Sequence, residues 1–286
     1  MSTPPFLELP AGVRATSLPT PRGELAALSA EPAQETGAPV LLVPGYTGSK
    51  EDFIAVLAPI AAAGHRVVAL DQRGQFETPG DGDPSSYDLK VLADDVLAVL
   101  AGLGAPAHLV GHSFGGLVAR TAALADPAAL RSLTLMSSGP AAIPAPANQT
   151  TALLAQVLPV MDLETIWVAK RQIESQTETD PPAPEIEAWL HARFVANHPV
   201  GMLRMAEQLL TETDRTDELH ALGLPVLVAF GDRDDVWPPS LQAETAARLG
   251  ARTASWPGVG HSPAADAPDT TVADLLAFWA TTESPS

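Results

Sequence analysis

The stretch His108-Leu109-Val110-Gly111-His112-Ser113-Phe114-Gly115-Gly116-Leu117 joins a short apolar run, a serine between two glycines and the start of an amphipathic pattern. The apolar run is typical of a buried strand, and the pattern after Gly115 is typical of a helix. Glycines on both sides of Ser113 are expected where a strand turns sharply into a helix, because side chains there would collide with the backbone. The stretch therefore predicts a strand, a tight turn that exposes Ser113, and a helix.

Short apolar runs alternate with helix-length amphipathic stretches on both sides of this turn. A predicted hairpin at residues 13–29 opens the chain, and further strands are predicted at residues 39–43, 66–70, 107–110, 133–136, 225–230 and 252–256. Helices are predicted at residues 51–63, 87–103, 115–125, 240–249 and 270–281. This order predicts an α/β fold with a mostly parallel eight-stranded sheet flanked by helices.

The alternation stops between residues 141 and 221, where proline-rich loops and helical patterns at residues 151–172 and 185–211 replace strands. A segment of this length between two strands of one sheet is too long for a simple loop. We therefore expect an α/β core formed by residues 1–140 and 222–286, with residues 141–221 as an inserted helical lid over the carboxyl edge of the sheet.

Composition narrows the class of protein. The 286 residues include 34 acidic and 16 basic side chains, which gives a formal charge of −18 and makes nucleic acid an unfavourable partner. Cysteine is absent, so thiolate metal sites, disulfides and cysteine nucleophiles are excluded. The sequence shows neither a signal-peptide pattern nor an apolar run of membrane-spanning length. We expect a cytoplasmic protein without membrane insertion, and the sequence does not indicate its oligomeric state.

A nucleophilic serine needs a base that lies far away in sequence and close in space. His261 lies in a glycine-rich loop after the last predicted strand, where an imidazole could reach the carboxyl edge of the sheet. His112 adjoins Ser113, but the turn should direct its side chain into packing or a hydrogen bond. An orienting carboxylate is expected in the loop Gly231-Asp232-Arg233-Asp234-Asp235, which follows another predicted strand.

At this point the chain resembles the α/β-hydrolase family over nearly its whole length, including the order serine, aspartate, histidine. The family pattern Gly-x-x-Asp-x-x-x-Pro matches Gly231, Asp234 and Pro238. The resemblance implies a catalytic triad of Ser113, Asp234 and His261, in which Asp235 is a credible substitute for the acid.

The resemblance also implies an oxyanion hole formed by the backbone amides of Tyr46 and Phe114. Pro44-Gly45-Tyr46 stands where many relatives have His-Gly, and Phe76 stands where relatives commonly have glycine. Nucleophilic aspartate, which related dehalogenases and epoxide hydrolases use, is excluded because that position is Ser113.

These features predict a serine hydrolase that cleaves a carboxylic ester, or a related acyl bond, of a small neutral or apolar substrate through an acyl-enzyme. No metal or organic cofactor is required. Trp237, Trp167 and Phe76 are candidate pocket residues, and the lid residues Trp189, Phe194, Met202 and Met205 are further candidates. The same triad would also serve a peptidase, a thioesterase, a carbon–carbon bond hydrolase or a perhydrolase, and a non-catalytic ligand-binding protein is the alternative outside enzymes.

Overall fold

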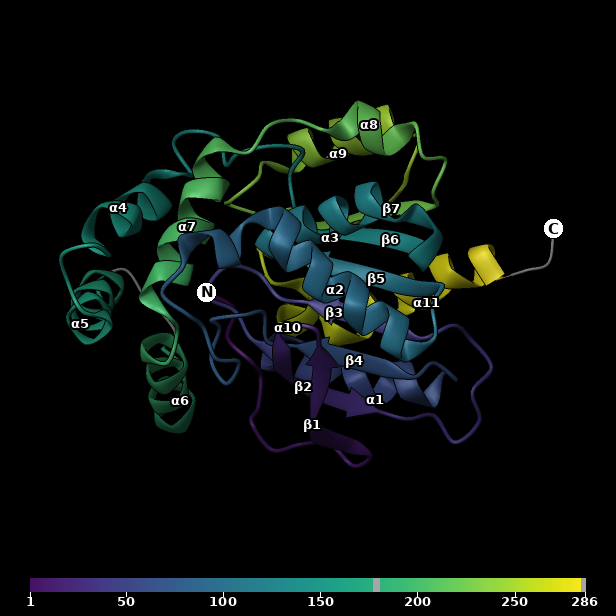
Figure 1. Ribbon diagram of the computed structural model, residues 1–286, viewed down its shortest axis with the longest axis horizontal. Helices are drawn as coiled ribbons and strands as arrows, with labels where there is room; N and C mark the ends of the chain where they lie inside the picture. Colours follow the sequence, from purple (N-terminus) through teal and green to yellow (C-terminus); the bar gives the residue numbers. More distant parts are fainter. Residues whose placement is uncertain (177–180, 284–286) are drawn as a thin grey trace.

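The computed structural model describes residues 1–176 and 181–283. Its centre is an eight-stranded sheet in the order β1-β2-β4-β3-β5-β6-β7-β8 (Figure 1). The strands are β1 (Val13–Thr20), β2 (Gly23–Ala30), β3 (Val40–Val43), β4 (Val67–Leu70), β5 (Ala107–His112), β6 (Leu130–Met136), β7 (Val226–Gly231) and β8 (Arg252–Trp256). The β1–β2 hairpin is antiparallel, β2 runs antiparallel to β4, and all other neighbouring pairs are parallel. The predicted α/β fold is confirmed.

Helices cover both faces of the sheet, as the apolar strands β3 to β7 require. One face packs against α2 (Leu89–Leu103), α3 (Phe114–Ala125) and α9 (Pro239–Leu249), and the other against α1 (Ile54–Ala62) and α11 (Pro268–Glu283). The short helices α8 (Thr216–His220) and α10 (Pro263–Asp266) were not predicted, because four or five residues are too few to show a helical period. Within the described ranges, none of the helices has the length and hydropathy to span a bilayer.

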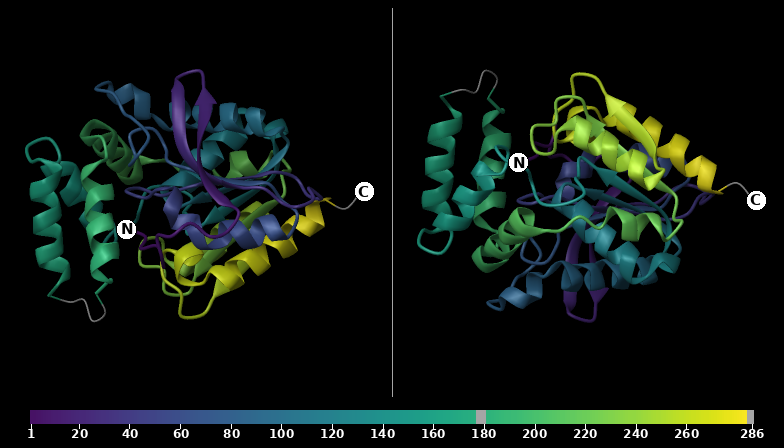
Figure 2. Two further views of the ribbon diagram at one scale, coloured as in Figure 1. Left: turned by 90° about the horizontal axis from the view of Figure 1, so that it is seen from below. Right: turned by 90° about the horizontal axis from the view of Figure 1, so that it is seen from above.

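Among the described residues between β6 and β7, four of the five helices form a helical insertion: α4 (Gln149–Val157), α5 (Leu163–Glu174), α6 (Pro184–Val195) and α7 (Pro199–Thr211). Helices α4, α5 and α6 gather at one end of the molecule, opposite the C-terminus (Figures 1 and 2). The helical patterns predicted at residues 151–172 and 185–211 each form two helices instead of one. Asp162 caps α5 by accepting a hydrogen bond from the Thr165 amide at 2.7 Å, and Pro199 begins α7 because proline has no N–H for an interior helical bond.

The helical insertion has an apolar core of its own and a buried polar connection to the sheet domain. Its core includes Leu163, Trp167 and Phe194. The guanidinium of Arg193 in α6 is fully buried and donates to Asp52 Oδ1 at 2.6 Å and to the carbonyl oxygen of Ser2 at 2.6 Å. This ion pair joins α6 to the short 3-10 helix Lys50–Phe53, which lies between β3 and α1. The lid role and the boundaries of residues 141–221 remain predictions, and residues 177–180 of that segment lie outside the described residues.

Candidate active site

Ser113 lies in the turn between β5 and α3, as the sequence predicts. Its backbone has φ 54°, a left-handed value that is costly for any residue except glycine. The glycines on either side are required by close backbone contacts: a Cβ at Gly111 would overlap the carbonyl of Gly115, and a Cβ at Gly115 would overlap the carbonyl oxygen of Val43. The amide of Ser113 donates to the carbonyl of Met136 on β6 at 2.9 Å, which fixes the turn against the sheet.

The structure brings Ser113, His261 and Asp234 together in a hydrogen-bonded series. His261 Nε2 lies 3.0 Å from Ser113 Oγ, and His261 Nδ1 lies 2.9 Å from Asp234 Oδ1. The three residues follow β5, β8 and β7, so each lies at the carboxyl edge of the sheet. Because an ionised carboxylate only accepts hydrogen bonds, the Nδ1 proton belongs to His261 and Nε2 is free to accept from the serine hydroxyl.

Asp234 is buried, and four donors surround its carboxylate. Oδ1 accepts from the amides of Val236 at 2.9 Å and Trp237 at 3.3 Å as well as from His261, and Oδ2 accepts from Gln242 Nε2 at 2.9 Å. Burial by itself raises the pKa of Asp234, but the hydrogen bond and charge of His261 and the other donors outweigh burial and lower the pKa. Asp235 is exposed and lies at the edge of a cavity beside Ser113.

His112 fixes the backbone of the loop that contains His261. Its Nε2 donates to the carbonyl oxygen of His261 at 2.7 Å, which agrees with the prediction of a hydrogen bond. Burial lowers the pKa of His112 to about 3, so its imidazole is neutral at physiological pH.

The loop after β3 also lies close to Ser113. A Cβ at Gly45 would lie 2.9 Å from Ser113 Cβ and 3.3 Å from its Oγ, so glycine is needed there. Gln75 Nε2 donates to the carbonyl of Gly45 at 2.8 Å, and Gln72 Nε2 donates to the carbonyl of Pro44 at 2.8 Å. The carbonyl of Gly45 and the amide of Tyr46 belong to one planar peptide unit and point in opposite directions. Gln75 therefore fixes the direction of the Tyr46 amide.

The amides of Tyr46 and Phe114, the predicted oxyanion donors, are both available. Among the residues that the structure describes, neither amide has a hydrogen-bond acceptor. Phe114 is the first residue of α3, where amides point out of the helix without an internal partner.

A cavity of about 450 Å³ lies beside Ser113 and His261. The sheet domain contributes Tyr46 and Val236 to its wall, and the helical insertion contributes Leu154 from α4 and Phe194 from α6. Lys170, Glu174, Asp52 and Asp235 add charged groups to the lining. The size falls within the range of small-molecule sites.

The three predicted pocket residues lie outside the described lining of this cavity. Trp237 is fully buried, and its indole nitrogen donates to the carbonyl of Ala141 at 3.2 Å, so its ring serves packing. Trp167 is buried in the core of the helical insertion and borders a second cavity. Phe76, whose φ is 41°, packs edge-on against Trp189 and beneath the ammonium of Lys50.

Sequence reasoning missed three glutamines that orient the site, namely Gln72, Gln75 and Gln242. Each one uses its side-chain amide to fix a group beside Ser113 or His261, and each is buried. No pattern in the stretch Asp71-Gln72-Arg73-Gly74-Gln75 identifies the carbonyl groups that Gln72 and Gln75 reach.

Comparisons with known proteins agree with this architecture. The chain is 28% identical over 256 residues to a non-heme haloperoxidase of Rhodococcus erythropolis, which covers 85% of this chain and 92% of that one. It is 32% identical over 192 residues to a pimeloyl-[acyl-carrier protein] methyl ester esterase of Aeromonas hydrophila, covering 64% and 72% of the two chains. A solved structure from a study of carboxylesterases of Nitrososphaera gargenis superposes with a TM-score of 0.76 at 20% identity, over 93% of this chain and 98% of that one. The model of the alpha/beta hydrolase family matches residues 40–275, and the chain therefore belongs to the α/β hydrolase family.

Proposed function

We propose that this protein is a serine esterase that cleaves a carboxylic ester of a small neutral or apolar compound. The observation that carries the proposal is the series Ser113 Oγ, His261 and Asp234, with distances of 3.0 Å and 2.9 Å, opening into a cavity of about 450 Å³. A general base within hydrogen-bond reach of a hydroxyl, and itself oriented by a carboxylate, is the arrangement that activates a serine nucleophile.

In the proposed mechanism, Ser113 Oγ attacks the ester carbon while His261 Nε2 takes the serine proton. The amides of Tyr46 and Phe114 stabilise the negative oxygen of the tetrahedral intermediate. His261 then gives the proton to the departing alkoxide, which leaves as the alcohol, and Ser113 retains the acyl group. Water attacks the acyl-enzyme, His261 accepts its proton, and collapse of the second intermediate releases the acid and returns the proton to Ser113.

The cavity supports the choice of substrate class. Its apolar wall includes Ile143, Leu154 and Phe194, and these side chains favour an apolar acyl or alcohol group. The formal charge of −18 disfavours polyanionic substrates at long range, although physiological salt screens this effect beyond about 8 Å. We also propose that the helical insertion acts as the lid of this cavity, because α4, α5 and α6 all contribute residues to its wall.

The first test uses a fluorophosphonate probe and a panel of aryl esters of increasing acyl length. Ser113→Ala should abolish labelling and lower kcat/KM by at least about 10⁴-fold without unfolding the protein. Ser262→Ala is the matched control, because Ser262 lines the same cavity beside His261, and this variant should still be labelled. Retained hydrolysis in Ser113→Ala refutes the mechanism.

The same panel separates the alternatives. Hydrolysis of an amide with the same acyl group would indicate a peptidase, and hydrolysis of the matching thioester would indicate a thioesterase. A reaction that depends on peroxide would indicate a perhydrolase. If intact protein shows neither labelling nor hydrolysis, the ligand-binding alternative is favoured instead.

A further inference from the structure

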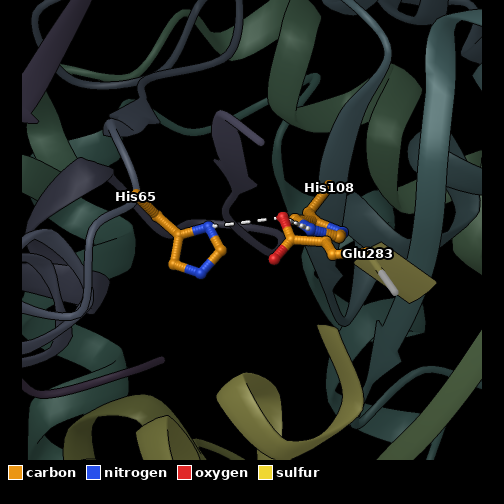
Figure 3. Close-up of side chains that lie close together, drawn as sticks. All are labelled: His65, His108 and Glu283. Carbon is orange, nitrogen blue, oxygen red and sulfur yellow. Dashed lines mark hydrogen bonds and ion pairs between the residues drawn. The ribbon is translucent and has the colours of Figure 1, made fainter. Parts of the chain in front are cut away.

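A second group of ligand-type side chains lies at the edge of the sheet opposite Ser113. His65 precedes β4, His108 is the second residue of β5, and Glu283 ends α11. Both imidazoles face the Glu283 carboxylate (Figure 3). Glu283 Oε1 lies 3.2 Å from His108 Nε2 and 4.0 Å from His65 Nδ1, and the three ligand atoms are all within 4.8 Å of one another. The amino ends of parallel strands thus converge with the end of the last helix.

The geometry is close to that of a tetrahedral Zn²⁺ site. With zinc–nitrogen bonds of about 2.0–2.1 Å, neighbouring ligand atoms lie roughly 3.3 Å apart and two bound imidazole centres roughly 5 Å apart. The distance from His108 to Glu283 already matches, and the two imidazole centres are 5.8 Å apart. A shift of less than about 1 Å at His65 would bring its Nδ1 to the ligand distance from Glu283 Oε1, and the ligand atoms of His65 and His108 lie within 4.8 Å of each other.

Partners outside the group orient two of the three side chains. Ser132 Oγ on β6 lies 2.7 Å from His108 Nδ1, so Nε2 is the nitrogen that faces Glu283. The amide of Ala38 donates to Glu283 Oε1 at 2.6 Å, and the indole of Trp279 stacks on the His108 ring at 4.9 Å. Ring nitrogens and carboxylates supported in this way are typical of metal ligands in proteins.

The third side chain has a competing bond. His65 Nδ1 donates to the carbonyl oxygen of Ala38 at 2.9 Å, so binding of an ion through Nδ1 requires loss of that proton and of that hydrogen bond. The proton can move to Nε2 of the same ring, as in the other neutral tautomer, so the ion would replace the hydrogen bond to Ala38.

An entry path and space for a solvent ligand lie next to the group. A cavity of about 240 Å³ is bordered by His65, Glu283, Gly37 and Ala63. A water molecule from this cavity could occupy the fourth position, as it does in zinc sites with three protein ligands. Gly37 lies against the His65 ring so closely that a Cβ there would overlap it.

We propose that His65, His108 and Glu283 bind one Zn²⁺ ion, which attaches the end of α11 to the amino edge of the sheet. Two imidazoles and one carboxylate suit Zn²⁺ and its neighbours Co²⁺, Ni²⁺ and Cu²⁺, whereas Mg²⁺ and Ca²⁺ prefer all-oxygen sites. The site is separate from Ser113 and does not depend on the proposed hydrolysis. The ion stabilises the fold, because only the folded chain brings the three ligands together.

The test uses the full-length protein after treatment with EDTA and removal of the chelator. We expect Zn²⁺ to bind with a 1:1 stoichiometry and a dissociation constant below about 10 µM in competition with a chromogenic chelator. Zn²⁺ at about 100 times that constant should raise Tm by about 5 °C or more. Co²⁺ should produce the visible absorption bands of a four-coordinate site.

Variants identify the ligands without relying on enzymatic activity. Glu283→Gln retains an oxygen for the Ala38 amide but loses the charged ligand, and His65→Gln removes a ring nitrogen. Each should weaken Zn²⁺ binding at least tenfold and remove the Co²⁺ bands. His191→Gln is the matched control, because His191 forms an exposed pair with Glu164 at 2.8 Å in the helical insertion, and it should bind as the parent does. Absence of 1:1 binding, or equal affinity in all three variants, overturns the proposal and leaves the group as a hydrogen-bond network.

Discussion

The carboxylate of Asp234 offers the sharpest quantitative test of the site. In Asp234→Asn, the amide oxygen must stay at the Oδ1 position, because three donors, from His261, Val236 and Trp237, point at that atom. The His261 tautomer is then preserved, and the variant loses charge alone. Two opposite charges about 4 Å apart attract by about 4 kcal/mol at the effective dielectric constant of partly buried sites. The charged imidazole of the transition state loses this stabilisation, and kcat should fall by about 10³-fold.

The substitution also has a smaller structural cost. The new amide nitrogen at the Oδ2 position faces Gln242 Nε2, which is itself a donor. Gln242 could rotate its amide only by giving up its 2.8 Å bond to the carbonyl of Trp237. We therefore expect the free energy of unfolding to fall by about 1 kcal/mol, a loss far too small to explain the change in rate.

The assay is steady-state hydrolysis of the best aryl ester, with urea unfolding measured in parallel. Asp235→Asn is the control, because Asp235 is exposed and adjacent in sequence, and its kcat should change by less than about threefold. If Asp234→Asn retains more than about a tenth of the parent kcat, or if Asp235→Asn loses as much, the assignment of the acid is wrong.

Three further predictions concern the surroundings of the site. Gln75→Leu frees the Gly45 carbonyl and the Tyr46 amide, so kcat should fall by about 10- to 100-fold with KM little changed; an unchanged kcat contradicts the orienting role. Burial lowers the pKa of His112 to about 3, so below pH 6.5 the unfolded chain binds a proton at this residue and the folded chain does not. The free energy of unfolding should therefore fall by about 1.4 kcal/mol per pH unit between pH 6.5 and about pH 3, and should not depend on this group above pH 6.5. Urea unfolding of His112→Gln should show a shallower pH dependence. Arg193→Met leaves Asp52 buried without its partner and should cost about 3–5 kcal/mol in urea unfolding; a loss below about 1 kcal/mol would refute this.

The turn that holds Ser113, the proposed nucleophile, was predictable because the signal is local. Glycines at positions 111 and 115 are required by backbone contacts within the turn itself, and the strand and helix on either side have regular apolar periods. His261 and Asp234 were placed by their positions after strands, since parallel strands bring their carboxyl ends to one edge. The alternation of strands and helices followed from the same periodicity, whereas the order of the strands in the sheet was not predicted.

The orienting glutamines and most of the pocket wall were not predictable in this way. Among the described residues that line the cavity, Phe194 is the one pocket candidate that the sequence had suggested. Gln75 reaches a carbonyl 30 residues away in sequence, and its partner is defined only once β3 and β4 lie side by side. Large aromatic residues near the site suggested a pocket wall, but residue type does not tell which face a side chain takes. The ring of Trp237 packs against Gly139, and its indole N–H donates to the carbonyl of Ala141.

The left-handed backbone of Ser113 has an evolutionary consequence. Only glycine adopts such a conformation at no steric cost, so selection for thermal stability alone would favour glycine at position 113. Serine at this position imposes backbone strain, and in the proposed mechanism the hydroxyl group is the reason that serine is needed there. In a library screened for heat resistance without an activity filter, this position should be among those where the surviving sequences drift away from the natural residue.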